Sequence, residues 1–129
     1  MDTPLILLIE DEVLIRDLLT PEFTDAGFEI VAADDGDRAI AELEKDANRF
    51  KAVITDVKLG EGPNGWDVGR RARELVPDMP VIYITGDSAH EWSAKGVPDS
   101  VVIVKPFTFV QVSTAVSTLM TVADTRRTT

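Results

Sequence analysis

Three carboxylates, one hydroxyl and one ammonium group directly follow four short apolar runs of this sequence. They belong to Glu10, Asp11, Asp56, Thr85 and Lys105. Mg²⁺ in proteins takes a few carboxylate oxygens, keeps several waters and completes its octahedron with phosphate oxygens of a substrate. Adjoining carboxylates repel one another, and a hard cation relieves that repulsion. We therefore predict a Mg²⁺ site with Asp11 and Asp56 as direct ligands and with Glu10 holding a metal-bound water.

The residues beside these acids extend the prediction. A backbone carbonyl just after Asp56, at Lys58, is well placed to be a further metal ligand. No glycine-rich turn follows the first apolar run, although nucleotide-binding and flavin-binding sheets usually place backbone amides there to cradle phosphate. Because this turn is acidic, a phosphate group has to arrive together with a metal ion.

The apolar runs that precede these side chains have the length and composition of buried strands. They are short, rich in valine and isoleucine, and separated by helical patterns, as in parallel sheets covered on both faces. The predicted strands are Leu5–Ile9, Phe28–Ala33, Ala52–Thr55, Val81–Ile84 and Val101–Val104.

Helices are predicted between the strands from apolar residues that recur at helical spacing. The first helix carries the apolar residues Ile15, Leu19, Phe23 and Ala26, contains Pro21 and is closed by Gly27. The other predicted helices are Gly36–Ala47, a helix from Gly65 to Val76, about two turns within Ser88–Lys95, and Thr108–Val122. A Gly/Pro-rich loop from Lys58 to Gly65 precedes the third helix. The residues after the last helix, 123–129, are predicted to be a short, polar, frayed tail.

Strict alternation of strand and helix predicts a doubly wound α/β fold with a five-stranded parallel sheet. In the flavodoxin-like strand order 2-1-3-4-5, the first and third strands are neighbours at the switch point. Ligands of such sheets bind outside the carboxyl ends of the strands. The fold thus predicts that Glu10 and Asp11 lie beside Asp56.

Composition excludes several classes of function. The chain has 129 residues, no cysteine and a net charge of −10, so disulfides, thiolate metal sites and cysteine nucleophiles are absent. The negative charge argues against direct binding of nucleic acid, because phosphate contacts need clustered Lys and Arg. No leader pattern and no apolar run of about 20 residues is present, and we expect a cytoplasmic protein without membrane contact.

Four motifs in this order resemble the response-regulator receiver domains of two-component signalling, the CheY-like superfamily. They are ILLIEDE at Ile6–Glu12, VITD at Val53–Asp56, VIYITG at Val81–Gly86, and KPF at Lys105–Phe107. Asp56 follows Asp11 by 45 residues, Thr85 follows Asp56 by 29, and Lys105 follows Thr85 by 20. The resemblance spans about residues 4–122, which we take as one receiver domain.

The resemblance implies a role for each residue of the predicted site. Asp56 would accept a phosphoryl group from the phosphohistidine of a sensor histidine kinase or a histidine phosphotransferase, with Mg²⁺ organised by Glu10 and Asp11. Thr85 would hydrogen-bond the bound phosphoryl group and Lys105 would pair with it, which suits a reaction that needs positioning and charge neutralisation. The peptide bond from Lys105 to Pro106 would be cis.

The sequence also departs from the family pattern. Val102 stands where the family usually has an aromatic residue, Gly86 stands where it usually has alanine, and the segment after Thr85 is about two residues short. We hypothesise that the Gly86 backbone and a loosely held fourth helix carry the switch instead. Lys58 and Asp87 occupy places that tune phosphate hydrolysis in the family, and we predict slow self-dephosphorylation.

Several functions fit these residues. The leading interpretation is a stand-alone receiver, a monomer or weak homodimer, that signals by protein contact through its fourth-helix, fifth-strand, fifth-helix face. A phosphate sink or relay and a phosphorylation-independent binding module are alternatives. A Mg²⁺-dependent phosphatase with an aspartyl intermediate would need a second acid where Lys58 stands. We therefore expect no enzyme, only a phosphoacceptor that supports its own phosphorylation and dephosphorylation.

Overall fold

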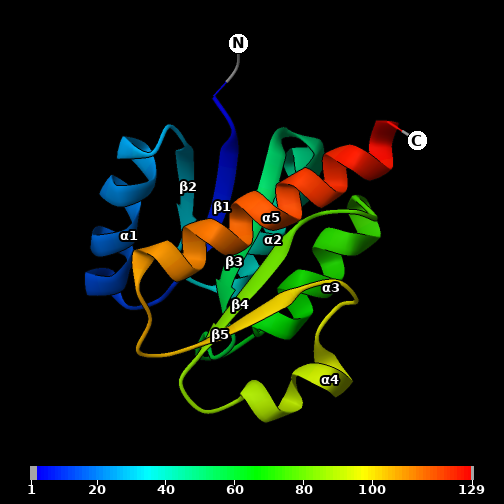
Figure 1. Cartoon of the computed structure of the whole chain (residues 1–129). Coiled ribbons are helices and arrows are strands. Elements are labelled where there is room, and N and C mark those ends of the chain that lie inside the picture. Colours follow the sequence, from blue (N-terminus) through cyan, green and yellow to red (C-terminus); the bar gives the residue numbers. More distant parts are fainter. Residues whose placement is uncertain (1–2, 129) are drawn as a thin grey trace.

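The computed structural model describes residues 3–128 and contains one parallel sheet of five strands (Figure 1). The order across the sheet is β2-β1-β3-β4-β5, which confirms the predicted flavodoxin-like order. The strands are β1 (Leu5–Ile9), β2 (Glu29–Ala33), β3 (Phe50–Asp56), β4 (Val81–Thr85) and β5 (Val101–Val104). All neighbouring pairs are parallel, so every strand ends at the same edge of the sheet.

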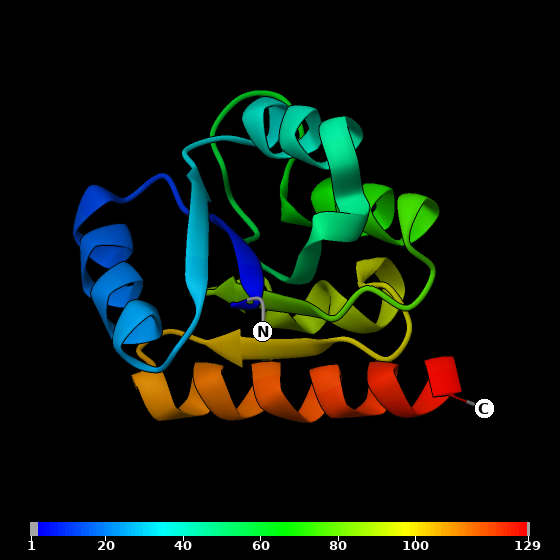
Figure 2. The same ribbon diagram turned by 90° about the horizontal axis from the view of Figure 1, so that it is seen from above.

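Helices cover both faces of the sheet, as expected for right-handed crossovers (Figure 2). They are α1 (Val13–Asp25), α2 (Gly36–Asp46), α3 (Gly65–Leu75), α4 (Trp92–Lys95) and α5 (Phe109–Thr128). Helices α1 and α5 lie on one face, while α2 and α3 pack together on the other. Single 3₁₀ turns precede β3 (Ala47–Arg49) and α4 (Ala89–Glu91).

The core is divided by the sheet into two apolar clusters. Leu7 and Ile9 of β1 point into the cluster beneath α2 and α3, whereas Ile6 and Leu8 point into the cluster beneath α1 and α5. Successive side chains of a strand alternate between faces, and both faces are covered here. The unbroken apolar run Leu5–Ile9 is the consequence, because no position of the strand's interior reaches water.

One strand and one helix have an end that differs by more than one residue from the sequence-based prediction. Strand β3 begins at Phe50 rather than Ala52 and includes Asp56. Helix α5 continues to Thr128, six residues beyond its predicted end at Val122, while fraying of this terminal segment stays a prediction. The extension is held by packing, because Ala123 is buried, and by an ion pair of 3.2 Å between Arg126 and Asp99.

Helix α4 is short, as predicted from the reduced spacing between Thr85 and Lys105. It has four residues, and neither it nor the turn before it contains a buried residue. Within residues 3–128, no helix combines the length and the apolar character needed to cross a membrane.

Candidate functional site

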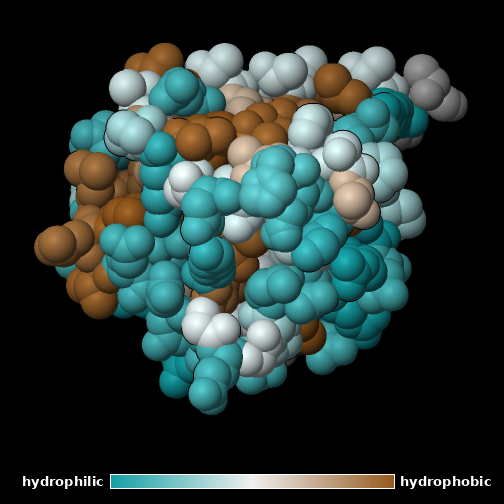
Figure 3. Space-filling model, turned by 90° about the horizontal axis from the view of Figure 1, so that it is seen from below, coloured by the Kyte–Doolittle hydropathy of each residue, from teal (hydrophilic) through white to brown (hydrophobic). Residues whose placement is uncertain are grey.

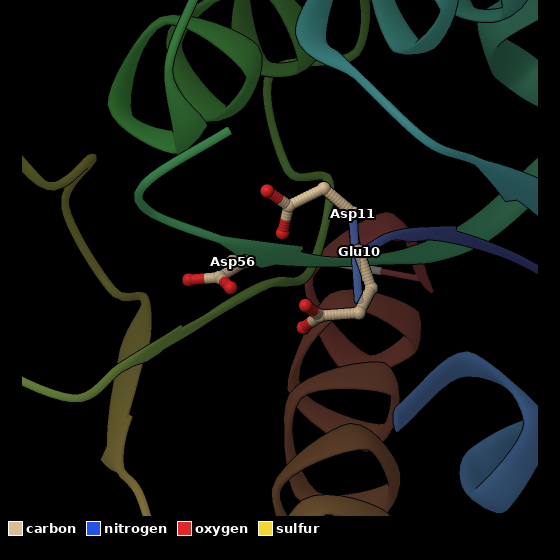
Figure 4. A group of neighbouring side chains, drawn as sticks. All are labelled: Glu10, Asp11 and Asp56. Carbon is tan, nitrogen blue, oxygen red and sulfur yellow. The ribbon is translucent and has the colours of Figure 1, made fainter. Parts of the chain in front are cut away.

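The carboxylates of Glu10, Asp11 and Asp56 meet where β1 and β3 end (Figure 4). Each offers one oxygen, and these oxygens lie within 4.8 Å of one another. Glu10 and Asp56 are buried, whereas Asp11 is exposed. The predicted convergence of the three acids is confirmed, and the set has the all-oxygen chemistry that Mg²⁺ prefers.

The carboxyl of Glu10 is held in an environment that disfavours its charged form. Burial raises the pKa of its carboxyl to about 8, and the charge of Asp56 adds to the rise. The Glu12 backbone N–H, which donates to Glu10 Oε1 at 3.1 Å, and the Lys105 ammonium act in the opposite direction. A bound divalent cation would supply the positive charge that this buried pair of acids lacks.

Lys105 places its ammonium group among three carboxylates. Its Nζ lies 3.0 Å from Asp56 Oδ2, 3.3 Å from Glu12 Oε1 and 3.8 Å from Glu10 Oε2. Desolvation works to lower the pKa of Lys105, but the hydrogen bond and charge of Asp56, together with the other two acids, raise it above its ordinary value. The ammonium therefore stays charged beside the proposed phosphoacceptor.

The backbone around Lys105 fixes this position. Its N–H donates to the carbonyl of Thr85 at 2.8 Å, which joins the end of β5 to the end of β4. The peptide bond from Lys105 to Pro106 is cis, as the family resemblance implied.

Thr85 lies buried at the end of β4 and lines the same pocket. Its Oγ1 accepts hydrogen bonds from the backbone N–H groups of Ser88 at 2.9 Å and Asp87 at 3.3 Å. Since a hydroxyl has one donor besides its acceptor lone pairs, the O–H of Thr85 is the part that can serve a phosphoryl oxygen.

A pocket of about 390 Å³ opens above these groups. It is lined by Asp11, Glu12, Asp56, Lys58, Thr85, Gly86, Asp87 and Lys105. At its rim, Lys58 Nζ and Asp87 Oδ2 form an exposed ion pair of 2.6 Å. The hydrogen bond between these two side chains raises the pKa of Lys58 and lowers that of Asp87. The backbone carbonyl of Lys58 as a metal ligand stays a prediction.

The start of α3 holds the end of β3 in place. The N–H of Gly65 donates to the Val57 carbonyl at 2.8 Å, and a Cβ on Gly65 would collide with the carbonyl oxygen of Asp56. Asn64 and Asp67 close a capping box in which each side chain accepts the other's backbone N–H at 3.0 Å. Glycine at position 65 thus allows the start of α3 to approach the backbone of Asp56 closely and to fix the end of β3 beside the pocket.

One residue of the site was not singled out from the sequence. Glu12 lines the pocket and contacts Lys105, and it is the third acid of the run that begins at Glu10. The three consecutive acids are visible in the sequence, but only the first two were assigned to the site, because they come directly after the strand.

A buried tyrosine of β4 lies beside Val102, the position at which the family usually has an aromatic residue. Val102 is half-buried and pairs in register with Tyr83 of β4, whose side chain is fully buried. The Tyr83 hydroxyl accepts the N–H of Val97 at 3.1 Å. Gly69 permits this, because a Cβ there would collide with the Tyr83 hydroxyl. Tyr83 of β4 therefore binds the segment after α4 to the core.

Comparison with known proteins agrees with this geometry. A family model described as "Response regulator receiver domain" matches residues 6–117. The crystal structure of a response regulator receiver protein from Sinorhizobium medicae is 42% identical with a TM-score of 0.91, and the match covers 95% of this chain and 98% of that one. Response regulator TrrA from Thermotoga maritima, solved in complex with Mg(2+)-BeF, is 30% identical with a TM-score of 0.77; that match covers 90% of this chain and 98% of TrrA.

Curated relatives include longer proteins. The probable transcriptional regulatory protein SilR of Salmonella typhimurium is 33% identical over 117 residues, which are 89% of this chain and 50% of SilR. The chain thus spans about half the length of the first curated relatives that it matches.

Proposed function

This chain belongs to the family of response regulator receiver domains, and we propose that it acts as a phosphorylation-dependent switch. In this proposal Asp56 accepts a phosphoryl group from the phosphohistidine of a sensor histidine kinase or a histidine phosphotransferase. The observation that carries it is the position of Asp56, which lies in a pocket of about 390 Å³ with Lys105 at 3.0 Å and two further acids beside it.

Each group of the site has a task in the transfer. An oxygen of the Asp56 carboxylate forms a bond to phosphorus while the bond from phosphorus to the imidazole nitrogen breaks, and its electron pair stays on that nitrogen. The Lys105 ammonium turns from Asp56 towards an oxygen of the incoming phosphoryl group, and the Thr85 O–H donates to another. These contacts stabilise charge that spreads over the phosphoryl oxygens in the transition state.

Mg²⁺ fits the donor set of the pocket. Asp11 and Asp56 would be its carboxylate ligands, Glu10 would hold one of its waters, and the carbonyl of Lys58 would be a further ligand. When bound, the ion neutralises the charge of the acids and of the phosphoryl group. The raised pKa of Glu10 is consistent with this assignment, because burial and the charge of Asp56 both disfavour its ionised form and a bound cation would favour it.

A protein donor suits the surroundings of the pocket. Apolar side chains gather on α1 at the edge of the face on which the strands end (Figure 3). They include Val13, Leu14 and Leu18, whose exposed fractions are 54%, 84% and 61%. Exposed apolar patches of this kind mark protein contacts. A partner carrying the phosphohistidine can bury them while its imidazole enters the pocket.

Output would follow through protein contact on the surface formed by α4, β5 and α5. Val104 and Val110 are exposed there, which supports a target protein on this face. The acidic charge supports neither nucleic acid nor an anionic membrane surface as the target. We propose a cytoplasmic monomer or weak homodimer that supports only its own phosphorylation and dephosphorylation.

Intact mass after incubation with Mg²⁺ and acetyl phosphate tests the proposal. We expect one added phosphoryl group in the wild type and none in Asp56→Asn or in the presence of EDTA. A phosphoryl group that persists in Asp56→Asn would refute Asp56 as the acceptor. Absence of any adduct in the wild type, with acetyl phosphate and with a panel of kinases, would favour the phosphorylation-independent binding module.

A further inference from the structure

Glu12 lines the pocket with a side chain that does not cap its own helix. It is the N-cap residue of α1, yet its side chain makes no capping hydrogen bond. Side chains at this position usually accept a backbone N–H from the first turn. The carboxylate of Glu12 instead reaches Lys105, 93 residues further along the chain, with Oε1 3.3 Å from Nζ.

The backbone of Glu12 is fixed from both sides. Its N–H donates to Glu10 Oε1, and its carbonyl accepts the N–H groups of Ile15 and Arg16 at 3.1 Å each. The side chain is 61% exposed, so burial does not hold it in place. The contact with Lys105 is therefore the interaction that orients this carboxylate.

We propose that Glu12 is a positioning residue that holds the Lys105 ammonium between itself and Asp56 in the unphosphorylated protein and thereby slows phosphorylation of Asp56. The inference rests on the proposed function and adds a residue that lowers the rate of phosphorylation. Phosphorylation requires Lys105 to turn towards the phosphoryl group, and the bond to Glu12 opposes that movement. The charge of Glu12 at the pocket mouth also repels an anionic donor.

The step that Glu12 slows is the transfer itself. With acetyl phosphate as donor, an oxygen of the Asp56 carboxylate forms a bond to phosphorus. The bond from phosphorus to the acyl oxygen breaks, and acetate leaves with the electron pair. Glu12 takes no part in bond formation, and its effect passes through Lys105.

Initial rates of phosphorylation at saturating Mg²⁺ and fixed ionic strength, measured against acetyl phosphate concentration, test this role. Glu12→Gln should react up to about fivefold faster, the range set by an exposed ion pair. Glu12→Asp keeps the charge but is one methylene shorter and loses its reach to Lys105, so it should also react faster. Asp17→Asn removes an equal charge from α1 outside the pocket and should match the wild type.

A second measurement does not depend on phosphorylation. The side-chain NMR resonance of Lys105 at fixed pH should shift in both Glu12 variants and stay unchanged in Asp17→Asn. Wild-type rates for Glu12→Asp alongside a faster Glu12→Gln would overturn the contact with Lys105 as the cause, as would equal acceleration by Asp17→Asn. If the wild type accepts no phosphoryl group, the proposed function fails, and an unshifted Lys105 resonance would separately overturn the contact.

Discussion

Among the single residues of the site, Glu10 links pH to stability most directly. Burial and the neighbouring Asp56 raise the pKa of its carboxyl from 4.5 to about 8. Between these values the folded protein binds more protons than the unfolded chain, so the free energy of unfolding falls as pH rises. The loss of stability caused by ionising the buried Glu10 is absent below about pH 4.5 and complete above about pH 8.

We expect Glu10→Gln to remove this dependence in metal-free protein, because the amide cannot ionise while its oxygen can still accept the N–H of Glu12. Urea unfolding with EDTA between pH 5 and 8 measures it. The stability of the wild type relative to Glu10→Gln should fall by a few kcal/mol over that interval. Parallel pH profiles for the two proteins would contradict the buried, ionising Glu10.

The ion pair of Lys58 and Asp87 leads to a prediction about the rate of self-dephosphorylation. The predicted opposite-charge pair is formed at the pocket rim, with 2.6 Å between Nζ and Oδ2. We expect the pair, which lies across the rim, to limit the approach of water to an acyl phosphate on Asp56. Lys58→Asn should therefore speed self-dephosphorylation several-fold, as measured by the decay of the phosphorylated mass after the donor is removed.

The control for this experiment is a lysine outside the site. Lys45→Asn removes the same charge from α2, where Lys45 pairs with Glu42 at 3.4 Å, and should leave the decay rate unchanged. Equal decay in Lys58→Asn and the wild type would rule out a shielding role for the pair.

At the scale of elements, the segment between β4 and β5 is bound at both of its ends and more loosely in its middle, because the N–H groups of Asp87 and Ser88 donate to Thr85 Oγ1. Its C-terminal part is bound to the core, because the Tyr83 hydroxyl accepts the N–H of Val97 and the Arg73 guanidinium donates to the carbonyl of Pro98. Helix α4 and the turn before it contain no buried residue. Elements with so few buried apolar contacts open with a low free-energy cost.

Phosphorylation should therefore change amide exchange over residues 86–96 and leave Val97 protected. The reason is that Thr85 Oγ1, which accepts the N–H groups of Asp87 and Ser88, lies at the start of this segment and would be recruited by the phosphoryl group. Hydrogen exchange with and without Mg²⁺ and acetyl phosphate, with Asp56→Asn as control, measures it. Equal protection of residues 86–100 in both states would contradict a switch built on Gly86 and α4.

The elements show where sequence reasoning succeeds and where it fails. The strand ends could be predicted because Val- and Ile-rich runs stop at a polar residue, which is the property that places Asp56 and Lys105 in the pocket. The end of α5 could not, because its Thr-, Val- and Ser-rich sequence carries a weak helical signal. What extends it is tertiary: Ala123 is buried and Arg126 pairs with Asp99.

The contact between Glu12 and Lys105 likewise could not be predicted from the sequence. Strand-end reasoning places both residues at the same edge of the sheet, but it does not say which of three successive acids an ammonium group will contact. That choice depends on the side chain of Glu12 leaving the α1 cap, which only the folded geometry fixes.

At the scale of the whole molecule, the acidic pocket lies within a chain of net charge −10. Self-repulsion of this size opposes the compact state and is screened by salt. Sodium chloride should therefore raise the free energy of unfolding modestly, and it should do so almost equally in the wild type and in Asp56→Asn, because screening acts on the whole charge distribution.

Magnesium chloride at the same ionic strength should add a contribution that screening cannot supply. A ligand that binds only the folded state stabilises it by about 1.4 kcal/mol when present at ten times its Kd. Urea unfolding in matched chloride salts separates the two effects. The excess stabilisation by Mg²⁺ should shrink in Asp56→Asn, whose acid cluster has lost one carboxylate, and should persist in Asp17→Asn, which leaves the cluster intact. Equal stabilisation by the two salts in the wild type would mean that these acids, though gathered at one edge of the sheet, hold no metal.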